Sequence, residues 1–225
     1  MCLVGNDVID LAAGHNRGRA QNRRLVERTL TAAERGLLAA DGDDDRSFAR
    51  LWSAKEAAYK AVRKCVPALV FAPRRWQVEL ARCPDRAEDC EGSVMIAADM
   101  QVAVRWRQTN DWIHCVALLG GPPELFDEGV ATAAEVGADG ASSERERDGF
   151  TCAESGGVRT LAKRLLRRYG AGAVEIVRAR IGAAHLPPRV YAGAAPMTGV
   201  DLSLSHDGRF VAAAIAMERR SIAPA

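Results

Sequence analysis

The sequence lacks several features by which membrane and nucleic-acid-binding proteins are recognised. Its formal net charge is only +2, although 27% of its 225 residues are charged, so bulk electrostatics give no support for binding to nucleic acid or to a membrane surface. No apolar run approaches the roughly 20 residues of a membrane span. The N-terminus also lacks the basic segment and apolar run of an export signal. We therefore expect a cytoplasmic protein without nucleic-acid or membrane partners.

Cysteine is present, but not in the spacings that mark metal or redox motifs. None of the six cysteines forms a C-x-x-C pair, and no cysteine and histidine group has zinc-finger spacing. Reduced thiols of a cytosolic protein are the expected state.

The hydrophobic pattern predicts two α+β regions separated by a linker. In residues 1–120, a short strand and helical segments precede four strands between residues 75 and 119. Residues 121–157 are rich in Gly, Ala and Ser, mostly acidic in their charge and without sustained periodicity, which predicts a flexible linker. Residues 158–220 begin with a basic helix and end in a hairpin that turns at Asp207-Gly208.

Three local signals add detail to this outline. Gly5-Asn6-Asp7 is turn-like, although it lies inside the first apolar strand. Thr31-Ala-Ala-Glu34 matches the capping box that starts a helix. Val200, Leu202 and Leu204 alternate with polar residues, so their strand is expected to have one apolar and one polar face.

The helix predicted at residues 47–64 carries charges that an amphipathic helix does not require. Its apolar residues follow the i, i+3, i+4 pattern of a buried stripe. Glu56 and Lys60 lie one turn apart, so a solvated ion pair would explain them. A carboxylate on this helix and Asp7 on a strand would instead suit Mg²⁺, which takes one or two protein carboxylates together with phosphate oxygens and waters.

Polar groups near the C-terminus also allow two interpretations. Ser203 and Ser205 share one strand face and His206 follows them, which fits either a hairpin with a surface histidine or a set of donors to phosphate. A serine hydrolase is disfavoured because no G-x-S-x-G elbow contains Ser205. Arg164 and Arg168 lie one turn apart on the basic helix, either on a solvated face or in an anion site.

Together, these segments resemble the 4′-phosphopantetheinyl transferase superfamily. The family's G-x-D motif is matched by residues 5–7, its W/F-x-x-K-E-x-x-x-K motif completely by residues 52–60, and its S-x-S-H motif by residues 203–206. The resemblance covers residues 2–120 and about 157–217. It implies an α+β fold of two similar half-domains, each a small antiparallel sheet packed with helices.

The resemblance implies transfer of 4′-phosphopantetheine from coenzyme A to a serine of an apo acyl or peptidyl carrier protein, with release of 3′,5′-ADP. Such carriers serve fatty-acid, polyketide or nonribosomal-peptide biosynthesis, and the metal is Mg²⁺, or Mn²⁺ in its place. The residues carried over are Asp7 and Glu56 as metal ligands, Asp7, Glu56 and Lys60 as catalytic residues, and Lys60, Ser205, His206, Arg189, Arg164 and Arg168 as coenzyme A contacts.

Two departures from the family pattern leave alternatives open. Many two-half members have an acidic residue where this chain has Ile9, so a water would complete the metal shell. The S-x-S-H motif comes last, which suits either a monomer with its halves in permuted order or a short trimeric type with an insertion. The strands of residues 75–119 favour the permuted pseudo-dimer. An inactive member that binds coenzyme A or a carrier protein is the alternative function.

Overall fold

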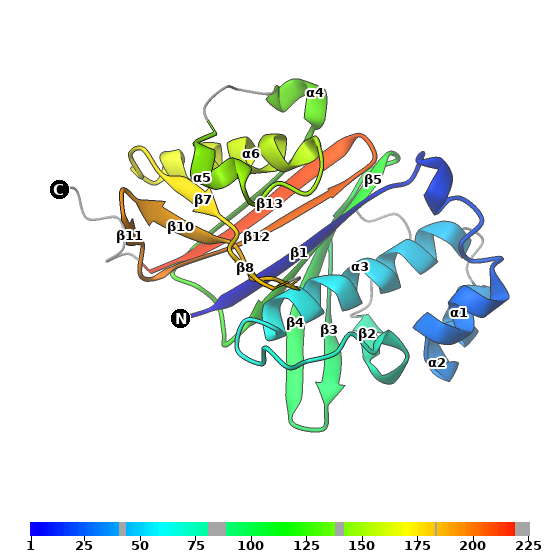
Figure 1. Ribbon diagram of the computed structural model, residues 1–225. Coiled ribbons are helices and arrows are strands. Elements are labelled where there is room, and N and C mark those ends of the chain that lie inside the picture. Colours follow the sequence, from blue (N-terminus) through cyan, green and yellow to red (C-terminus); the bar gives the residue numbers. More distant parts are fainter. Residues whose placement is uncertain (41–43, 81–88, 138–141, 183, 219–225) are drawn as a thin grey trace.

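The first sheet has five antiparallel strands in the order β1-β5-β4-β3-β2 (Figure 1). The computed structural model describes residues 1–40, 44–80, 89–137, 142–182 and 184–218. Four of these strands are the ones predicted between residues 75 and 119, so that prediction is confirmed. The strands are β1 (Leu3–Asp10), β2 (Gln77–Leu80), β3 (Asp89–Ala97), β4 (Met100–Gln108) and β5 (Trp112–Leu119).

Helices between β1 and β2 cover this sheet. They are the 3-10 helix η1 (Gly14–Asn16), α1 (Arg23–Thr29), α2 (Ala32–Ala40), α3 (Asp44–Val62) and the 3-10 helix η2 (Pro73–Arg75). The predicted stripe of α3 is buried against the sheet, with Phe48, Leu51 and Val62 at most 3% exposed. The apolar periodicity of residues 47–64 therefore identified the helix that fixes the first core.

Gly5-Asn6-Asp7 is not a turn, contrary to the expectation from its composition. All eight residues of β1 pair in register with β5. A Cβ atom at Gly5 would collide with the backbone oxygen of Ala57 on α3. Glycine is thus required here for close approach between strand and helix.

A buried ion pair connects α3 to the helices α1, α2 and η2 beside it. Lys55 is fully buried, and its Nζ donates to Glu34 Oε2 at 2.6 Å and to the backbone oxygens of Thr29 and Pro73 at 2.9 Å. Glu34 Oε2 also accepts the Thr31 N–H, and the Glu34 N–H donates to Thr31 Oγ1, so the predicted capping box is confirmed. The lysine beside Glu56 in the helix motif is therefore a structural residue.

The second sheet has three antiparallel strands in the order β12-β13-β6, namely β12 (Val200–Asp207), β13 (Phe210–Met217) and β6 (Leu125–Thr132). Helix α6 (Glu154–Arg168) packs on it through Leu161, Leu165 and Leu166 (Figure 1). The predicted alternation in β12 is confirmed, but the hairpin turns at Gly208-Arg209, because Asp207 still pairs with Phe210. The remaining elements are α4 (Ala133–Val136), α5 (Glu144–Arg147), β7 (Glu175–Val177), β8 (Arg180–Ile181), β9 (Ala184–His185), β10 (Arg189–Ala192) and β11 (Ala195–Pro196).

The expectation that residues 121–157 form a flexible linker needs correction. Strand β6 lies in this segment and pairs over its whole length with β13. Thr132 and Ser143 each cap a short helix through a complete capping box. The sequence did not reveal this strand because every residue of β6 is only partly buried. The strand therefore lacks the alternation of buried and exposed residues by which strands are recognised.

The two sheets meet through a ladder of side-chain hydrogen bonds between β1 and β12, which run parallel (Figure 1). Backbone N–H groups of alternate residues of β1 donate to alternate side chains of β12, all polar. We call these contacts the side-chain ladder. The donor and acceptor pairs are Val4 with Asp201 at 2.7 Å, Asn6 with Ser203 at 2.9 Å, Val8 with Ser205 at 3.2 Å, and Asp10 with Asp207 at 2.8 Å.

Two cations close the ends of the side-chain ladder. Lys64 Nζ donates to Asp201 Oδ2 and to the backbone oxygens of Val4 and Leu202, all within 2.7 Å. At the other end, Arg209 in the hairpin turn donates two hydrogen bonds to the Asp10 carboxylate at 2.8 and 2.9 Å. Residues almost 200 positions apart are thereby held side by side.

Among the described helices, none is long and apolar enough to cross a membrane. Cys2, Cys65, Cys115 and Cys152 are free thiols, as expected. Cys90 is disulfide-bonded, which departs from the expectation of reduced thiols.

Replacement of Lys55 by methionine tests the buried ion pair. Lys55→Met leaves the carboxylate of Glu34 buried without its cation, so we expect a loss of about 3–5 kcal/mol in the free energy of unfolding, measured by chemical denaturation. Arg23→Met is the matched control, because Arg23 pairs with Glu27 on the surface, and its unfolding midpoint should not change. A Lys55→Met midpoint equal to that of the control would contradict this role.

The Asp10–Arg209 pair should make stability depend on acid. Hydrogen bonds from Arg209 lower the pKa of Asp10 to about 2, below its usual value near 3.8. The pair therefore stabilises the fold fully above pH 4, and the contribution is lost as the pH falls toward 2. In Arg209→Gln, we expect lower stability at pH 7 and a shallower decline between about pH 4 and 2, measured by denaturation at each pH. If the stability of Arg209→Gln and of the unchanged protein declined in parallel between about pH 4 and 2, the pair would not be the cause of the acid dependence.

Candidate active site

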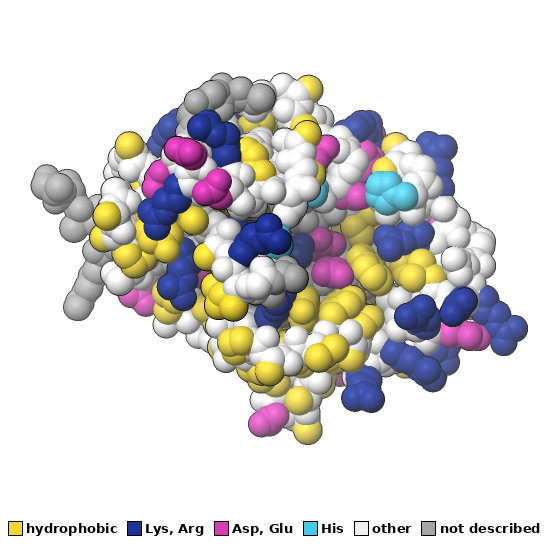
Figure 2. Space-filling model, viewed as in Figure 1, with side chains coloured by type: hydrophobic (Ala, Val, Ile, Leu, Met, Phe, Trp, Pro, Cys, Tyr) yellow, Lys and Arg dark blue, Asp and Glu magenta, His cyan; other side chains and the backbone are white. Residues whose placement is uncertain are grey.

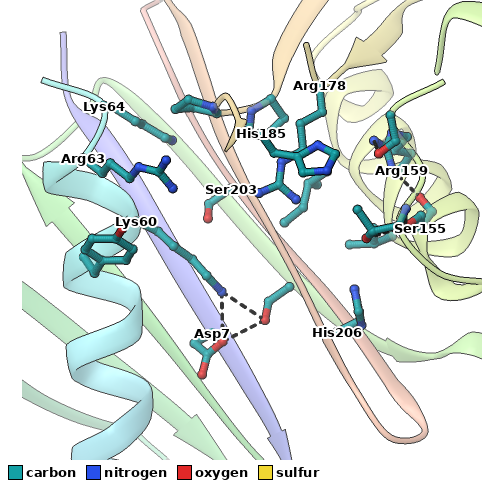
Figure 3. A pocket seen from close by; sticks show the side chains of 18 residues that line it. Asp7, Lys60, Arg63, Lys64, Ser155, Arg159, Arg178, His185, Ser203 and His206 are labelled. Carbon is teal, nitrogen blue, oxygen red and sulfur yellow. Dashed lines mark hydrogen bonds and ion pairs between the residues drawn. The ribbon is translucent and has the colours of Figure 1, made fainter. Parts of the chain in front are cut away.

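A pocket of about 250 Å³ opens where α3, β1 and β12 meet. Lys60 on α3 and Asp7 on β1 lie at its base, and the Lys60 Nζ donates to Asp7 Oδ1 and to the Asn6 backbone oxygen, both at 2.9 Å (Figure 3). The structure thus pairs Lys60 with Asp7, whereas the helix spacing alone suggested a surface pair with Glu56.

Ser205 brings the second sheet into this group. Its Oγ donates to Asp7 Oδ1 at 3.0 Å, accepts the Val8 N–H, and lies 3.4 Å from Lys60 Nζ. The three side chains therefore form a closed triangle of polar contacts, of which Figure 3 labels Asp7 and Lys60. The side-chain ladder sets this geometry, because it fixes the register of β12 against β1.

Glu56 lies one turn before Lys60 and is partly buried. Burial and the nearby carboxylate of Asp7 raise its pKa to about 7, against the opposing charges of Lys60 and Arg19. Within the described ranges, no group donates a hydrogen bond to the Glu56 carboxylate. Asp7 lines the pocket, whereas Glu56 does not and is linked to it only through its interaction with Asp7. Two carboxylates that repel one another are a donor set that suits a hard divalent cation. Figure 2 shows acidic side chains in the hollow at the centre of this face, with basic side chains beside them.

Two arginines, Arg63 and Arg178, line the same pocket together with His185 (Figure 3). We call the two arginines the cationic rim. Burial and the charge of Arg63 lower the pKa of Arg178, which places the two guanidinium groups within electrostatic reach of each other. In the described part of the chain, no acidic side chain pairs with either arginine. Two neighbouring cations without a counter-ion are the electrostatic signature of an anion site.

His206 lines the same pocket, on the opposite face of β12 from Ser205. Its Nε2 lies 3.3 Å from the Sγ of Cys152, which precedes α6. Burial lowers the pKa of His206, with Lys60 acting in the same direction. The imidazole is thus close to the site but outside the Asp7–Lys60–Ser205 triangle.

Three arginines carried over from the family do not line this pocket. Arg164 donates to the backbone oxygen of Val136 at 3.0 Å, and Arg168 pairs with Asp127 at 3.1 Å. Arg189 lies on β10 and lines a neighbouring pocket. The i, i+4 spacing of the first two placed them on one helix face, but the fold turns that face toward β6 and α4.

Sequence reasoning missed Arg63 and Arg178. Arg63 had a readable signal, because it follows Glu56 and Lys60 at i+7 and i+3 and so continues their helix face. Arg178 had none, since it lies in the irregular chain between the short strands β7 and β8. Its place in the pocket depends entirely on tertiary packing.

Neither Ile9 nor Asp10, which follow Asp7 on β1, supplies a further ligand to the carboxylate pair. Ile9 is 3% exposed and packs in the core beneath α3. Asp10 is bound to Arg209. A metal ion held by Asp7 and Glu56 would complete its coordination with phosphate oxygens or water.

No curated protein matches this chain. A family model does match it, over residues 3–113, and its description is the 4′-phosphopantetheinyl transferase superfamily. The matched span contains Asp7, Glu56 and Lys60, and it ends before β12. Residues 3–113 are therefore a domain of the 4′-phosphopantetheinyl transferase superfamily, as the sequence motifs predicted.

Proposed function

We propose that this protein transfers 4′-phosphopantetheine from coenzyme A to a serine of an apo acyl or peptidyl carrier protein and releases 3′,5′-ADP. The observation that carries the proposal is the meeting of Asp7, Lys60 and Ser205 in a pocket that Arg63 and Arg178 also line. The first three residues come from the three motifs that the family resemblance rests on, one residue from each. Their convergence in one pocket supports a single reaction site.

Asp7 and Glu56 are the proposed ligands of Mg²⁺, or of Mn²⁺ in its place. When bound, the ion would neutralise charge on the pyrophosphate of coenzyme A and orient the leaving group. Burial, and after it the repulsion from Asp7, raise the pKa of Glu56, and the closeness of the two carboxylates supports this assignment.

Lys60 is the proposed donor to a phosphate oxygen at the reacting centre. Its Nζ already lies between the Asp7 carboxylate and the Ser205 hydroxyl, so it is held in place before any substrate arrives. A preorganised cation stabilises developing negative charge without the cost of reorientation. Ser205 holds Asp7 on the other side and is the proposed second donor.

Glu56 is the proposed acceptor of the proton from the carrier's serine hydroxyl, directly or through a water. Efficient general bases have a pKa near the working pH, which agrees with a pKa of about 7 for this carboxyl. The Glu56 carboxylate also has no donor among the described side chains that would compete for its lone pairs. Its position one helical turn from Lys60 puts base and phosphate contact on the same face of α3.

Arg63, Arg178 and His206 are the proposed contacts of the remaining phosphate groups of coenzyme A. The two arginines replace Arg164 and Arg168 in this role, because those residues are engaged outside the pocket. Arg189 is retained as a contact of more distal parts of the nucleotide, since its pocket shares Arg63 and Lys64 with the first.

We also propose that the chain consists of two half-domains in permuted order and acts as a monomer. In each half, one strand pairs with the second strand of a hairpin, giving β1-β5-β4 and β6-β13-β12, and a long helix, α3 or α6, follows the first strand. Both halves of one chain contribute to the pocket, so no second subunit is needed to complete it. The half-domain boundary falls before β6 and no separate linker remains.

The transfer itself is tested with purified protein, coenzyme A, Mg²⁺ and several apo carrier proteins. Intact mass spectrometry should show the carrier gaining phosphopantetheine, and a metal chelator should abolish the gain. Asp7→Asn and Glu56→Gln should lower the rate by at least about 100-fold, because each removes a charged group from the reacting centre. Arg23→Ala, a surface charge outside the pocket, should retain the full rate.

The alternative function predicts a different pattern. An inactive member that binds coenzyme A or a carrier would show no mass gain with any carrier, yet calorimetry would detect coenzyme A binding by the folded protein. Such a result would rule out the transferase proposal.

Loss of either rim arginine should weaken coenzyme A binding more than chemistry. Arg63→Ala and Arg178→Ala each remove a charge-assisted hydrogen bond to phosphate, so we expect the KM for coenzyme A to rise by roughly 10- to 100-fold with a smaller change in kcat. Initial rates against coenzyme A concentration measure both constants, and Arg23→Ala controls for net charge. An unchanged KM in both pocket variants would show that the two arginines do not contact coenzyme A.

A further inference from the structure

A cysteine, a glutamate and a histidine converge at the edge of the pocket, away from the carboxylate pair. Cys152 immediately precedes α6, Glu154 begins that helix, and His206 lies near the end of β12. One donor atom from each residue lies within 4.8 Å of the other two. The sequence spacing gave no sign of this group, because 54 positions separate Cys152 from His206.

The distances suit a tetrahedral ion. Zinc bonds of about 2.3 Å to sulfur and about 2.0 Å to nitrogen would place the two ligand atoms about 3.5 Å apart. Cys152 Sγ and His206 Nε2 are 3.3 Å apart. The Glu154 carboxylate is partly exposed and accepts a hydrogen bond from the Cys152 thiol.

The backbone around the cysteine is held in place before any ion binds. Ser155 is 4% exposed, and its Oγ accepts the N–H groups of Thr151 and Cys152 at 3.1 and 3.3 Å. His206 is fixed by the pairing of β12 with β13. Two of the three donors therefore come from ordered backbone, which lowers the entropy lost when an ion is captured.

From this geometry, we propose that Cys152, Glu154 and His206 form a binding site for a thiophilic divalent ion of the Zn²⁺ class. A thiolate, an imidazole and a carboxylate are the ligand types that Zn²⁺ takes, and three protein ligands leave the fourth position open to water or an anion. Mg²⁺ prefers oxygen ligands and octahedral geometry, so it is not expected here. The site is distinct from the Asp7 and Glu56 pair and does not rest on the proposed transferase activity.

The ion would affect the pocket through His206, which lines both sites. Its Nε2 cannot bind an ion and donate to a phosphate at the same time. Occupation of the metal site would therefore withdraw this group from an anion in the pocket.

Cobalt titration of the full-length protein tests the site. Co²⁺ bound tetrahedrally to a thiolate gives a strong sulfur-to-metal charge-transfer absorption, which Co²⁺ in water lacks. We expect this absorption to saturate at one equivalent and to disappear when Zn²⁺ is added. The titration requires tag-free protein, with thiols kept reduced by a phosphine, because thiol reductants and histidine tags bind both metals.

Substitutions decide which residues hold the ion. Cys152→Ser should abolish the charge-transfer absorption and weaken Zn²⁺ binding by at least about 100-fold, and His206→Ala and Glu154→Gln should each weaken it. Cys65→Ser and His15→Ala are matched controls, since Cys65 is an exposed free thiol and His15 an exposed imidazole outside the group.

The outcome of the titration is decisive in either direction. Absence of the absorption in the unmodified protein, or its survival in folded Cys152→Ser, would overturn the proposal. Because the readout is metal absorption, it does not depend on whether the protein transfers phosphopantetheine.

Discussion

The side-chain ladder between β1 and β12 is the interaction on which the rest of the structure depends. A strand edge in the interior must satisfy each backbone N–H, and β1 does so on its second edge with carboxylates and hydroxyls from β12 in place of a backbone partner. Each shift of register by one residue would present leucine to those N–H groups. The ladder therefore fixes, in one step, how the sheets meet and which hydroxyl reaches Asp7.

The two halves are related in topology but not in chemistry. Strand β1 pairs with β5 over eight residues, and β6 pairs with β13 over eight residues. When the two strands are matched from their first residues, Asp7 corresponds to Gly129. By the same register, Ser205 corresponds to Arg107. The second possible site thus lacks both the carboxylate and the hydroxyl, and Arg107 faces Glu128 instead. This asymmetry agrees with the permuted pseudo-dimer proposed above.

Three charged residues of one motif on α3 have separate physical roles. Lys55 is buried with Glu34 and holds the fold, whereas Lys60 reaches across to β1. Glu56 follows Lys55 directly, and burial together with the nearby carboxylate of Asp7 raises its pKa to about 7. The helical repeat of 3.6 residues separates Lys55 from Glu56 by about 100°, which is why neighbouring residues of one motif serve a core and a site.

The sequence by itself determined the α+β class, the strands of the first sheet, the burial of α3, the capping box at Thr31, and the motif that identifies the superfamily domain. These features depend on periodicity and spacing among residues that are close together in the sequence. It did not determine that residues 121–157 contain β6, that Arg164 and Arg168 face away from the pocket, or that Arg178 and Cys152 lie at it. Those outcomes depend on contacts between residues far apart in the chain, such as the pairing of β6 with β13, the ion pair of Arg168 with Asp127, and the contact of Cys152 with His206.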